Sequence, residues 1–216
     1  MKGLLRALIP PAPCLHCHLP QPEHLWLCEG CRATLAPDGG TATTLTGGLN
    51  VESAFFYGGA CSALIPYAKD PVEPPLYAWL VAQAAELPNG SALVPVPTHW
   101  RRRIERGGCH TTALARALSA HLDLPVVHAL ERSHLAPKQS QQDRETRRQV
   151  RPEHFRCRDL ELPPGKVLLI DDVLTTGATL SAAARALLQT HALDDLGAWV
   201  LARRPASNEG FGLAKR

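Results

Sequence analysis

Apolar and polar residues alternate in blocks along the chain, and the clearest block lies between residues 167 and 188. Residues Val167–Ile170 form an unbroken apolar run, which is typical of a strand buried on both faces of a parallel sheet. From Leu180 to Leu188, apolar residues recur at helical spacing. The pattern predicts a strand that ends near residue 170, a short polar segment and then a helix.

Weaker versions of this pattern occur elsewhere in the chain. We expect strands at 50–57, 93–97, 126–130 and 198–202, helices at 63–69, 76–87 and 111–122, and a turn at Gly58–Gly59. Residues 138–158 are polar and basic, with almost no apolar residue before Phe155, and predict a mobile loop that could act as a lid. Strands that alternate with helices predict an α/β fold, in which helices flank a parallel sheet and the crossovers are right-handed.

Four cysteines near the start of the chain form a C-x2-C-x10-C-x2-C pattern, with Cys14 and Cys17 as the first pair and Cys28 and Cys31 as the second. Two such pairs are typical of a tetrahedral Zn²⁺ site, which is structural because four thiolates leave no open coordination position. Two disulfides or a redox-active pair are the alternatives, and disulfides need an oxidising compartment. Because so short a segment cannot bury a core of its own, we expect the metal to fold it.

Three histidines, His16, His18 and His24, lie within the same segment and could replace a sulfur ligand. With all four cysteines present, we expect these histidines to be surface residues. The chain of 216 residues can hold one α/β domain and a small module. The predicted organisation is a zinc-binding module at 1–36, a Thr- and Gly-rich linker at 37–49 and a larger domain at 50–216.

Composition and charge restrict the class of protein. No apolar run approaches the ~18 residues of a membrane span, and Arg6 with the prolines that follow it argues against a signal peptide, so we expect a cytoplasmic protein. The net charge of +3 is uneven, since residues 101–158 hold thirteen Lys and Arg against six Asp and Glu. A basic middle region suits a polyanionic ligand such as pyrophosphate or nucleic acid, and a solvated Arg-rich surface is the alternative.

Two adjacent carboxylates, Asp171 and Asp172, follow the predicted buried strand directly. After them, Thr175, Thr176, Gly177, Ala178 and Thr179 supply hydroxyl groups and one glycine before the predicted helix. Backbone N–H groups and the helix dipole bind anions at such a helix N-terminus, so the segment predicts a phosphate site. An ordinary strand-to-helix turn with Thr caps is the alternative, but adjacent acids at the edge of a core favour a ligand or cation.

Residues Ile170–Thr179 closely resemble the ribose-phosphate motif of type I phosphoribosyltransferases. The resemblance implies that Asp171 and Asp172 bind the ribose hydroxyls of phosphoribosyl pyrophosphate (PRPP). It also implies that the loop after Val173, Thr175–Thr179, wraps the 5′-phosphate and that Mg²⁺ accompanies the pyrophosphate.

The chain as a whole resembles the ComF/GntX family of competence-associated proteins. The shared positions are the double CxxC, Tyr57, Lys69, Val94–Pro97, Arg103, Arg106–Gly107, Gln139, Arg147, Phe155 and Asp171–Thr179. The resemblance implies a pyrophosphate loop after Pro97, with Arg101, Arg102 and Arg103 near the anion. It also implies a link to DNA uptake and natural competence, with single-stranded DNA or DNA-processing proteins as partners.

One departure from the family bears on activity. Typical members read Arg-Gly-Phe-Asn-Gln where this chain has Arg106-Gly107-Gly108-Cys109-His110. Loss of the aromatic residue and the carboxamides removes packing and hydrogen bonds from this segment. We therefore expect PRPP or nucleotide binding with little or no transferase activity; the alternative is an active Mg-dependent phosphoribosyltransferase of unknown acceptor.

The remaining cysteines, Cys61, Cys109 and Cys157, are isolated in the sequence. Cys109 and His110 suggest a Cys–His nucleophile, but sequence neighbours rarely face each other productively. A semi-buried or exposed thiol at Cys109 is therefore the expectation.

Overall fold

The structure is a computed structural model that describes residues 12–20, 26–40, 42–69, 74–98, 108–133 and 154–205. Its elements in chain order are α1 (Glu29–Arg32), β1 (Thr43–Thr44), β2 (Asn50–Phe56), α2 (Gly59–Ala68), α3 (Pro74–Ala82), β3 (Ala92–Pro95), α5 (His110–Leu122), β4 (Leu130–Arg132), β5 (Phe155–Cys157), β6 (Lys166–Leu174), α6 (Ala178–Thr190) and β7 (Asp195–Arg203).

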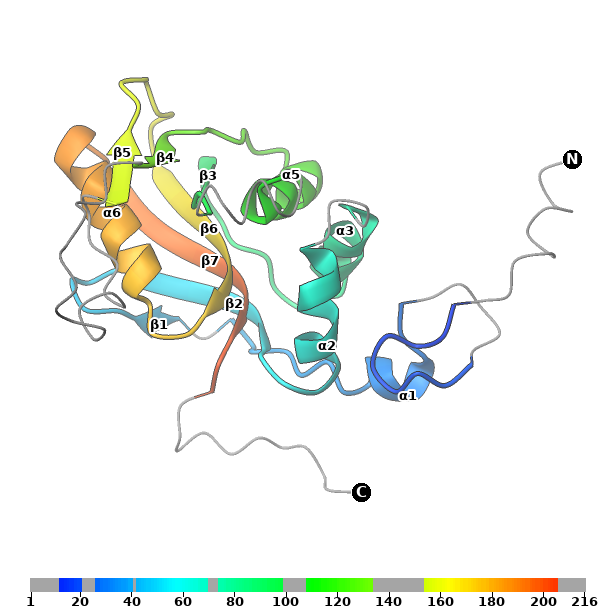
Figure 1. The fold of residues 1–216 in the computed structure, drawn as a ribbon. Coiled ribbons are helices and arrows are strands. Elements are labelled where there is room, and N and C mark those ends of the chain that lie inside the picture. The colour runs from blue at the N-terminus through cyan, green and yellow to red at the C-terminus, as the bar shows by residue number, and fades with distance from the viewer. Residues whose placement is uncertain are drawn as a thin grey trace, which may run out of the picture.

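A five-stranded sheet in the order β1-β2-β7-β6-β3 forms the centre of the described molecule (Figure 1). Strands β2, β7, β6 and β3 are parallel to their neighbours, and only β1 pairs antiparallel, with β2. The apolar run at 167–170 lies in β6, between β7 and β3, which is the doubly covered position that an unbroken apolar strand requires. The predicted α/β fold class is confirmed.

Helices cover both faces of this sheet. Figure 1 shows α6 and the small β4–β5 sheet on one side, and α2, α3 and α5 on the other. Successive residues of β6 supply the two cores in turn: Leu168 and Ile170 pack with the α2, α3 and α5 side, while Val167 and Leu169 pack with the α6 side. The carboxyl end of β6 therefore lies between two rigid layers.

The cysteine-rich segment packs against the helical layer. Cys14, Leu27 and Cys31 belong to the same buried cluster as residues of α2 and α3. Arg32 donates a hydrogen bond to Gln83 Oε1 at 2.6 Å, just beyond α3, and its guanidinium lies 6.0 Å from the ring centroid of Trp79. The cysteine-rich segment and the α/β layer thus share one apolar core.

A buried ion pair fixes the segment between the cysteines and the sheet. Arg203, at the end of β7, donates to both carboxylate oxygens of Asp38, at 2.6 and 2.7 Å, and Ser53 of β2 also donates to Asp38. Within 37–49, the predicted linker, Pro37 also bridges to Phe55 and Thr43–Thr44 forms β1. The domain boundaries stay predictions.

Several predicted boundaries were wrong. Helix α2 begins at Gly59, where a turn was predicted, and α3 already ends at Ala82. In place of a strand at 126–130, Val126 forms an isolated bridge with Leu93 and the strand β4 begins at Leu130. Phe155–Cys157 forms β5 because it pairs with β4, although it was assigned to a loop; residues 138–153 of that loop lie outside the described residues.

The described helices include none that is long and apolar enough to cross a membrane.

Candidate functional site

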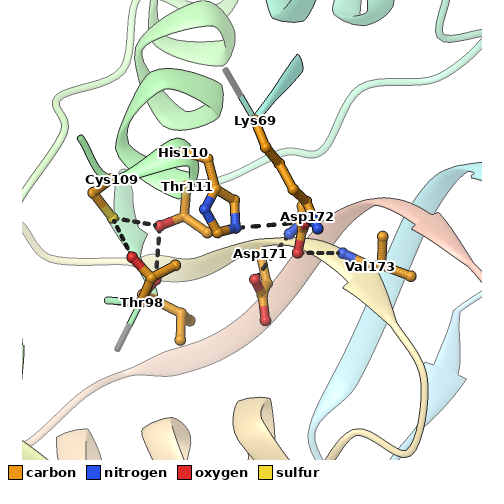
Figure 2. A network of polar contacts seen from close by, with 9 residues as sticks. Lys69, Thr98, Cys109, His110, Thr111, Asp171, Asp172 and Val173 are labelled. Atoms are coloured by element: carbon orange, nitrogen blue, oxygen red, sulfur yellow. Dashed lines mark hydrogen bonds and ion pairs between the residues drawn. The ribbon is translucent and has the colours of Figure 1, made fainter. Parts of the chain in front are cut away.

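The acidic pair lies inside β6 rather than after it, because the strand continues to Leu174. Each carboxylate is held by the backbone of the next residue. The Asp172 N–H donates to Asp171 Oδ1, and the Val173 N–H donates to Asp172 Oδ1, both at 2.9 Å (Figure 2). The pair therefore sits, with fixed orientation, near the carboxyl end of β6, where ligands of parallel α/β sheets bind.

Two further side chains meet on Asp172 from elsewhere in the chain. Lys69, the C-cap residue of α2, forms an ion pair with Asp172 Oδ2. His110, the first residue of α5, places its Nε2 atom 3.5 Å from the same oxygen. Figure 2 shows both side chains converging on Asp172. We call Lys69, His110, Asp171 and Asp172 the carboxylate cluster.

The two carboxylates of this cluster differ in protonation. Burial alone would raise the pKa of Asp172, but the hydrogen bond from His110 and the charge of Lys69 hold that pKa well below its ordinary value of 3.8. Burial and the negative charge of Asp172 raise the pKa of Asp171 well above 3.8. Asp172 is thus the ionised member of the pair, and Asp171 is the member that holds a proton more readily.

The predicted phosphate loop connects β6 to α6. Gly177 is the N-cap of α6 and has φ 73°, a conformation that favours glycine. A Cβ atom at Gly177 would lie 2.7 Å from the terminal methyl groups of Leu45, so a larger residue would also have to displace that side chain. The helix begins at Ala178, which places Thr179 in its first turn, and α6 has 13 residues, enough for a substantial dipole. The loop thus has the geometry of an anion site at a helix N-terminus.

The four-cysteine cluster is compact. One ligand atom from each of Cys14, Cys17, Cys28 and Cys31 lies within 4.8 Å of the others, and Cys17 Sγ is 3.7 Å from Cys28 Sγ. A tetrahedral ion with sulfur bonds of about 2.3 Å sets its sulfur atoms about 3.8 Å apart, so the cluster is consistent with a structural metal site. Burial and hydrogen bonds with the neighbouring thiols raise the pKa of Cys31 well above its ordinary value, so four thiolates need a cation between them.

One expectation about this cluster was wrong. His16 is half-buried rather than a surface residue, and its Nδ1 atom lies 3.3 Å from Cys31 Sγ. A ring N–H can donate to a metal-bound thiolate, so His16 fits a supporting position around the metal. His18 is exposed, and His24 lies outside the described residues.

Residues 104–210 match the family model of the phosphoribosyl transferase domain. The chain contains a phosphoribosyltransferase domain. The match includes α5, β6 and α6, hence His110, Asp171, Asp172 and the loop, whereas Lys69 lies before it. The resemblance to phosphoribosyltransferases is confirmed.

A curated relative is Competence protein F of Haemophilus influenzae, which is 32% identical over 118 residues. The alignment covers 52% of this chain and 50% of the relative, so the chain spans about half the length of the curated relative that it matches. This protein is a distant homologue of Competence protein F.

Solved adenine phosphoribosyltransferases show low similarity to the chain. The enzyme of Thermoanaerobacter pseudethanolicus is 14% identical, with coverage of 81% of this chain and 98% of that one and a TM-score of 0.39. The enzyme of Leishmania donovani is 15% identical, with coverage of 69% and 75% and a TM-score of 0.36. Similarity at this level says nothing about what this chain binds.

At the start of α5, in the phosphoribosyltransferase domain, the neighbouring residues Cys109 and His110 contact different groups. Cys109 Sγ lies 3.0 Å from Thr111 Oγ1, whereas His110 faces Asp172. The Thr111 hydroxyl donates its proton to the Val96 carbonyl at 2.7 Å, so it accepts the S–H of Cys109. Cys109 and His110 therefore have different partners.

The other isolated cysteines lie apart from the carboxylate cluster. Cys61 is fully buried in α2, and burial raises its pKa to about 12. Cys157 is half-buried and donates to the Ala186 carbonyl at 3.0 Å.

Sequence reasoning brought together the acidic pair and the loop but missed Lys69 and His110 as members of the same site. In the sequence, Lys69 stands out only as a position shared with the family, and His110 only as part of a departure from it and as a neighbour of Cys109 in a suggested nucleophile pair. Periodicity gives no signal for either, because each stands at a helix end whose place depends on the tertiary fold. Arg101, Arg102 and Arg103 lie outside the described residues, so their predicted role at pyrophosphate stays a prediction.

Proposed function

We propose that this protein binds a phosphoribosyl ligand, PRPP or a nucleotide, at the carboxyl end of β6. The observation that carries the proposal is the order of groups along one strand and helix of a phosphoribosyltransferase domain. An acidic pair fixed by its own backbone is followed by a left-handed glycine and then by the N-terminus of α6. These groups match, in sequence and in chemistry, a ribose and its 5′-phosphate.

The phosphate group of the ligand binds at the loop between β6 and α6. Backbone N–H groups of Thr176–Ala178 and the hydroxyl of Thr179 bind its oxygens, and Thr175 forms the start of the same loop. The dipole of α6 favours the negative charge there. Without a ligand, Thr176 Oγ1 accepts the Ala178 N–H at 3.4 Å, a long contact that a phosphate oxygen would replace.

The ribose of the ligand binds to the acidic pair, Asp171 and Asp172. Ionised Asp172 is a hydrogen-bond acceptor, and Asp171, whose raised pKa favours the protonated form, can both donate and accept when it holds a proton. Ribose hydroxyls also donate and accept, so a pair that differs in protonation suits them better than two identical carboxylates would. In this reading the pKa difference between Asp171 and Asp172 serves ligand recognition.

The structure offers less support for phosphoribosyl transfer than for ligand binding. His110 and Cys109 stand where a carboxamide pair is typical, and both are engaged within the fold, on Asp172 and Thr111. Since transfer depends on accurate positioning of pyrophosphate, we propose binding with little or no transfer to ordinary bases. In an active enzyme, Mg²⁺ would supply neutralisation of the pyrophosphate charge.

We also propose that Zn²⁺ occupies the four-cysteine cluster and has a structural role. A cellular role in competence, with DNA or DNA-processing partners, is supported by the name of the relative alone. Transformation frequency of a strain lacking this protein tests that role, and titration of an oligonucleotide at two salt concentrations tests direct DNA binding.

Calorimetric titration tests the proposed function directly. Ribose 5-phosphate should bind without Mg²⁺, and PRPP should bind with Mg²⁺, at micromolar-range affinity or weaker. If neither ribose 5-phosphate nor PRPP binds, the proposed phosphoribosyl-ligand binding is refuted. Robust pyrophosphate release from PRPP with any free base, lost in Asp172→Asn, would instead establish an active transferase.

A further inference from the structure

We propose that His110 is a positioning residue for ribose recognition, because its Nε2 atom fixes the carboxylate of Asp172 from the side opposite the backbone. The ligand hydroxyls then meet a carboxylate pair of defined orientation, with Asp171 as the more open member. This inference rests on the proposed function, since it assigns a role within the same site.

The oxygens of Asp172 already have partners. Its Oδ1 accepts the Val173 N–H at 2.9 Å, and its Oδ2 faces Lys69 and His110. The residue is 7% exposed, whereas Asp171 is half-buried. The orientation of Asp172 is thus set by protein groups, and Asp171 has the more accessible carboxylate.

Lys69 and His110 contribute differently to this orientation. A lysine ammonium stands on a long flexible stem and donates in any direction, so it neutralises charge without fixing the carboxylate. The imidazole has two side-chain torsions and belongs to the first residue of a 13-residue helix. His110 is therefore the rigid partner of Asp172 and Lys69 the flexible one.

The start of α5 is itself tied to the sheet. Thr111, the residue after His110, is fully buried and donates to the carbonyl of Val96, directly after β3. His110 is 9% exposed, and its Nδ1 atom has no hydrogen-bond partner among the described residues. The contact with Asp172 is therefore the polar interaction that offsets burial of this imidazole.

The experiment compares two ligands that share a phosphate. His110→Leu should weaken binding of ribose 5-phosphate about fivefold, the size of an ordinary coupling between neighbouring side chains, and leave inorganic phosphate binding unchanged. His110→Gln keeps an N–H donor and should restore affinity to within about twofold of wild type. The matched control is His121→Leu, the same change at an exposed position of α5, where the ring contacts only its own helix, at Ala117.

A double-mutant cycle separates positioning from a general structural role. If His110 acts through Asp172, His110→Leu should have no further effect on ribose 5-phosphate affinity in an Asp172→Asn protein. An equal loss in that background, an equal loss of phosphate affinity, or unchanged ribose 5-phosphate affinity in the single variant would each overturn the inference. If the Leu variant does not fold, His110→Asn, whose shorter side chain falls short of Asp172, replaces it with the same expected loss.

The two proposals fail in different ways. Wild-type protein that binds neither ribose 5-phosphate nor phosphate refutes the proposed function. Wild-type protein that binds both, with no change in His110→Leu, refutes only the role of His110.

Discussion

The four-cysteine cluster and the carboxylate cluster are assembled in opposite ways. The four cysteines stand within one short stretch, residues 14–31, so their spacing alone predicts the compact cluster that a tetrahedral metal ion would need. The carboxylate cluster takes Lys69 from the end of α2, His110 from the start of α5 and the acidic pair from β6. A site built from a local motif can be predicted from sequence, whereas one built by the tertiary fold shows only its local part.

The two clusters also handle charge differently. Four thiolates in one place need a metal ion to offset their repulsion, so the cysteine site is incomplete as protein alone. In the carboxylate cluster, Lys69 and His110 offset the charge of Asp172, and the raised pKa of Asp171 offsets the second carboxylate. The cysteine cluster should therefore depend strongly on its metal, and the carboxylate cluster should form without a ligand.

The largest expected effect comes from breaking the cysteine cluster. Cys28→Ser should release the metal completely, because metal binding and folding of such a module are one equilibrium worth about 10 kcal/mol or more. The sheet should stay folded with a lower Tm, since Cys14, Leu27 and Cys31 no longer pack firmly on α2 and α3. Metal content of the freshly purified, reduced protein and thermal unfolding measure both effects.

The matched control is Cys157→Ser, in which a hydroxyl can still donate to the Ala186 carbonyl. This variant should keep one metal ion per chain. A wild-type protein without metal, or equal loss in both variants, would contradict the assignment of the cluster.

The second-largest effect concerns the loop that adjoins the carboxylate cluster. Gly177→Val should abolish ribose 5-phosphate binding and lower the free energy of unfolding by about 1–3 kcal/mol, because the residue has a positive φ and a larger side chain would have to displace Leu45. Gly177→Ala, alone and with Leu45→Ala, separates these two causes. If the clash with Leu45 dominates, adding Leu45→Ala should restore stability. If the positive φ of residue 177 dominates, adding Leu45→Ala should not restore it. Unchanged ligand affinity in Gly177→Val would place the phosphate elsewhere.

The sequence was sufficient for features that depend on neighbours along the chain. The apolar run at 167–170, the helical spacing after Leu180 and the double CxxC predicted β6, α6 and the cysteine cluster. What could not be predicted depends on pairing between distant segments. β5 exists because Phe155–Cys157 pairs with β4, and His16 is half-buried because the module folds its Nδ1 atom toward Cys31.

A smaller effect distinguishes the two carboxylates. Asp172→Asn should lower the free energy of unfolding by about 1–3 kcal/mol and weaken ribose 5-phosphate binding, since it leaves Lys69 and His110 without their anionic partner. Asp171→Asn should have the smaller effect on both quantities, because a neutral amide resembles the protonated acid that the raised pKa of Asp171 favours. Titration calorimetry and urea unfolding of the two variants measure the difference, and equal losses would contradict the unequal protonation.

The pH dependence follows from the direction of each pKa shift. Asp171 has a raised pKa, so above its ordinary value of 3.8 the folded state keeps a proton that the unfolded state has lost, and stability falls as pH rises toward the folded pKa. Asp171→Asn should remove this decline, so its stability relative to wild type should increase as pH rises above 3.8 toward the folded pKa. The lowered pKa of Asp172 has the opposite sign, because its contribution is present above 3.8 and is lost as pH falls below that value.

The smallest expected effect tests whether the two clusters are independent. Thr34 Oγ1 donates to the Cys31 carbonyl at 2.7 Å and accepts the Ala60 N–H at 3.3 Å, near the start of α2, and the other end of α2 carries Lys69. Thr34→Val keeps the shape and the backbone hydrogen bond from the Thr34 N–H to the Cys31 carbonyl, but it removes the acceptor of the Ala60 N–H, which should lower the free energy of unfolding by about 1 kcal/mol. Because α2 is a continuous helix within the apolar core, the loss should stay local, with ribose 5-phosphate affinity changed by less than about twofold. A larger loss of affinity, measured at full metal occupancy, would show that the cysteine cluster positions Lys69 through α2.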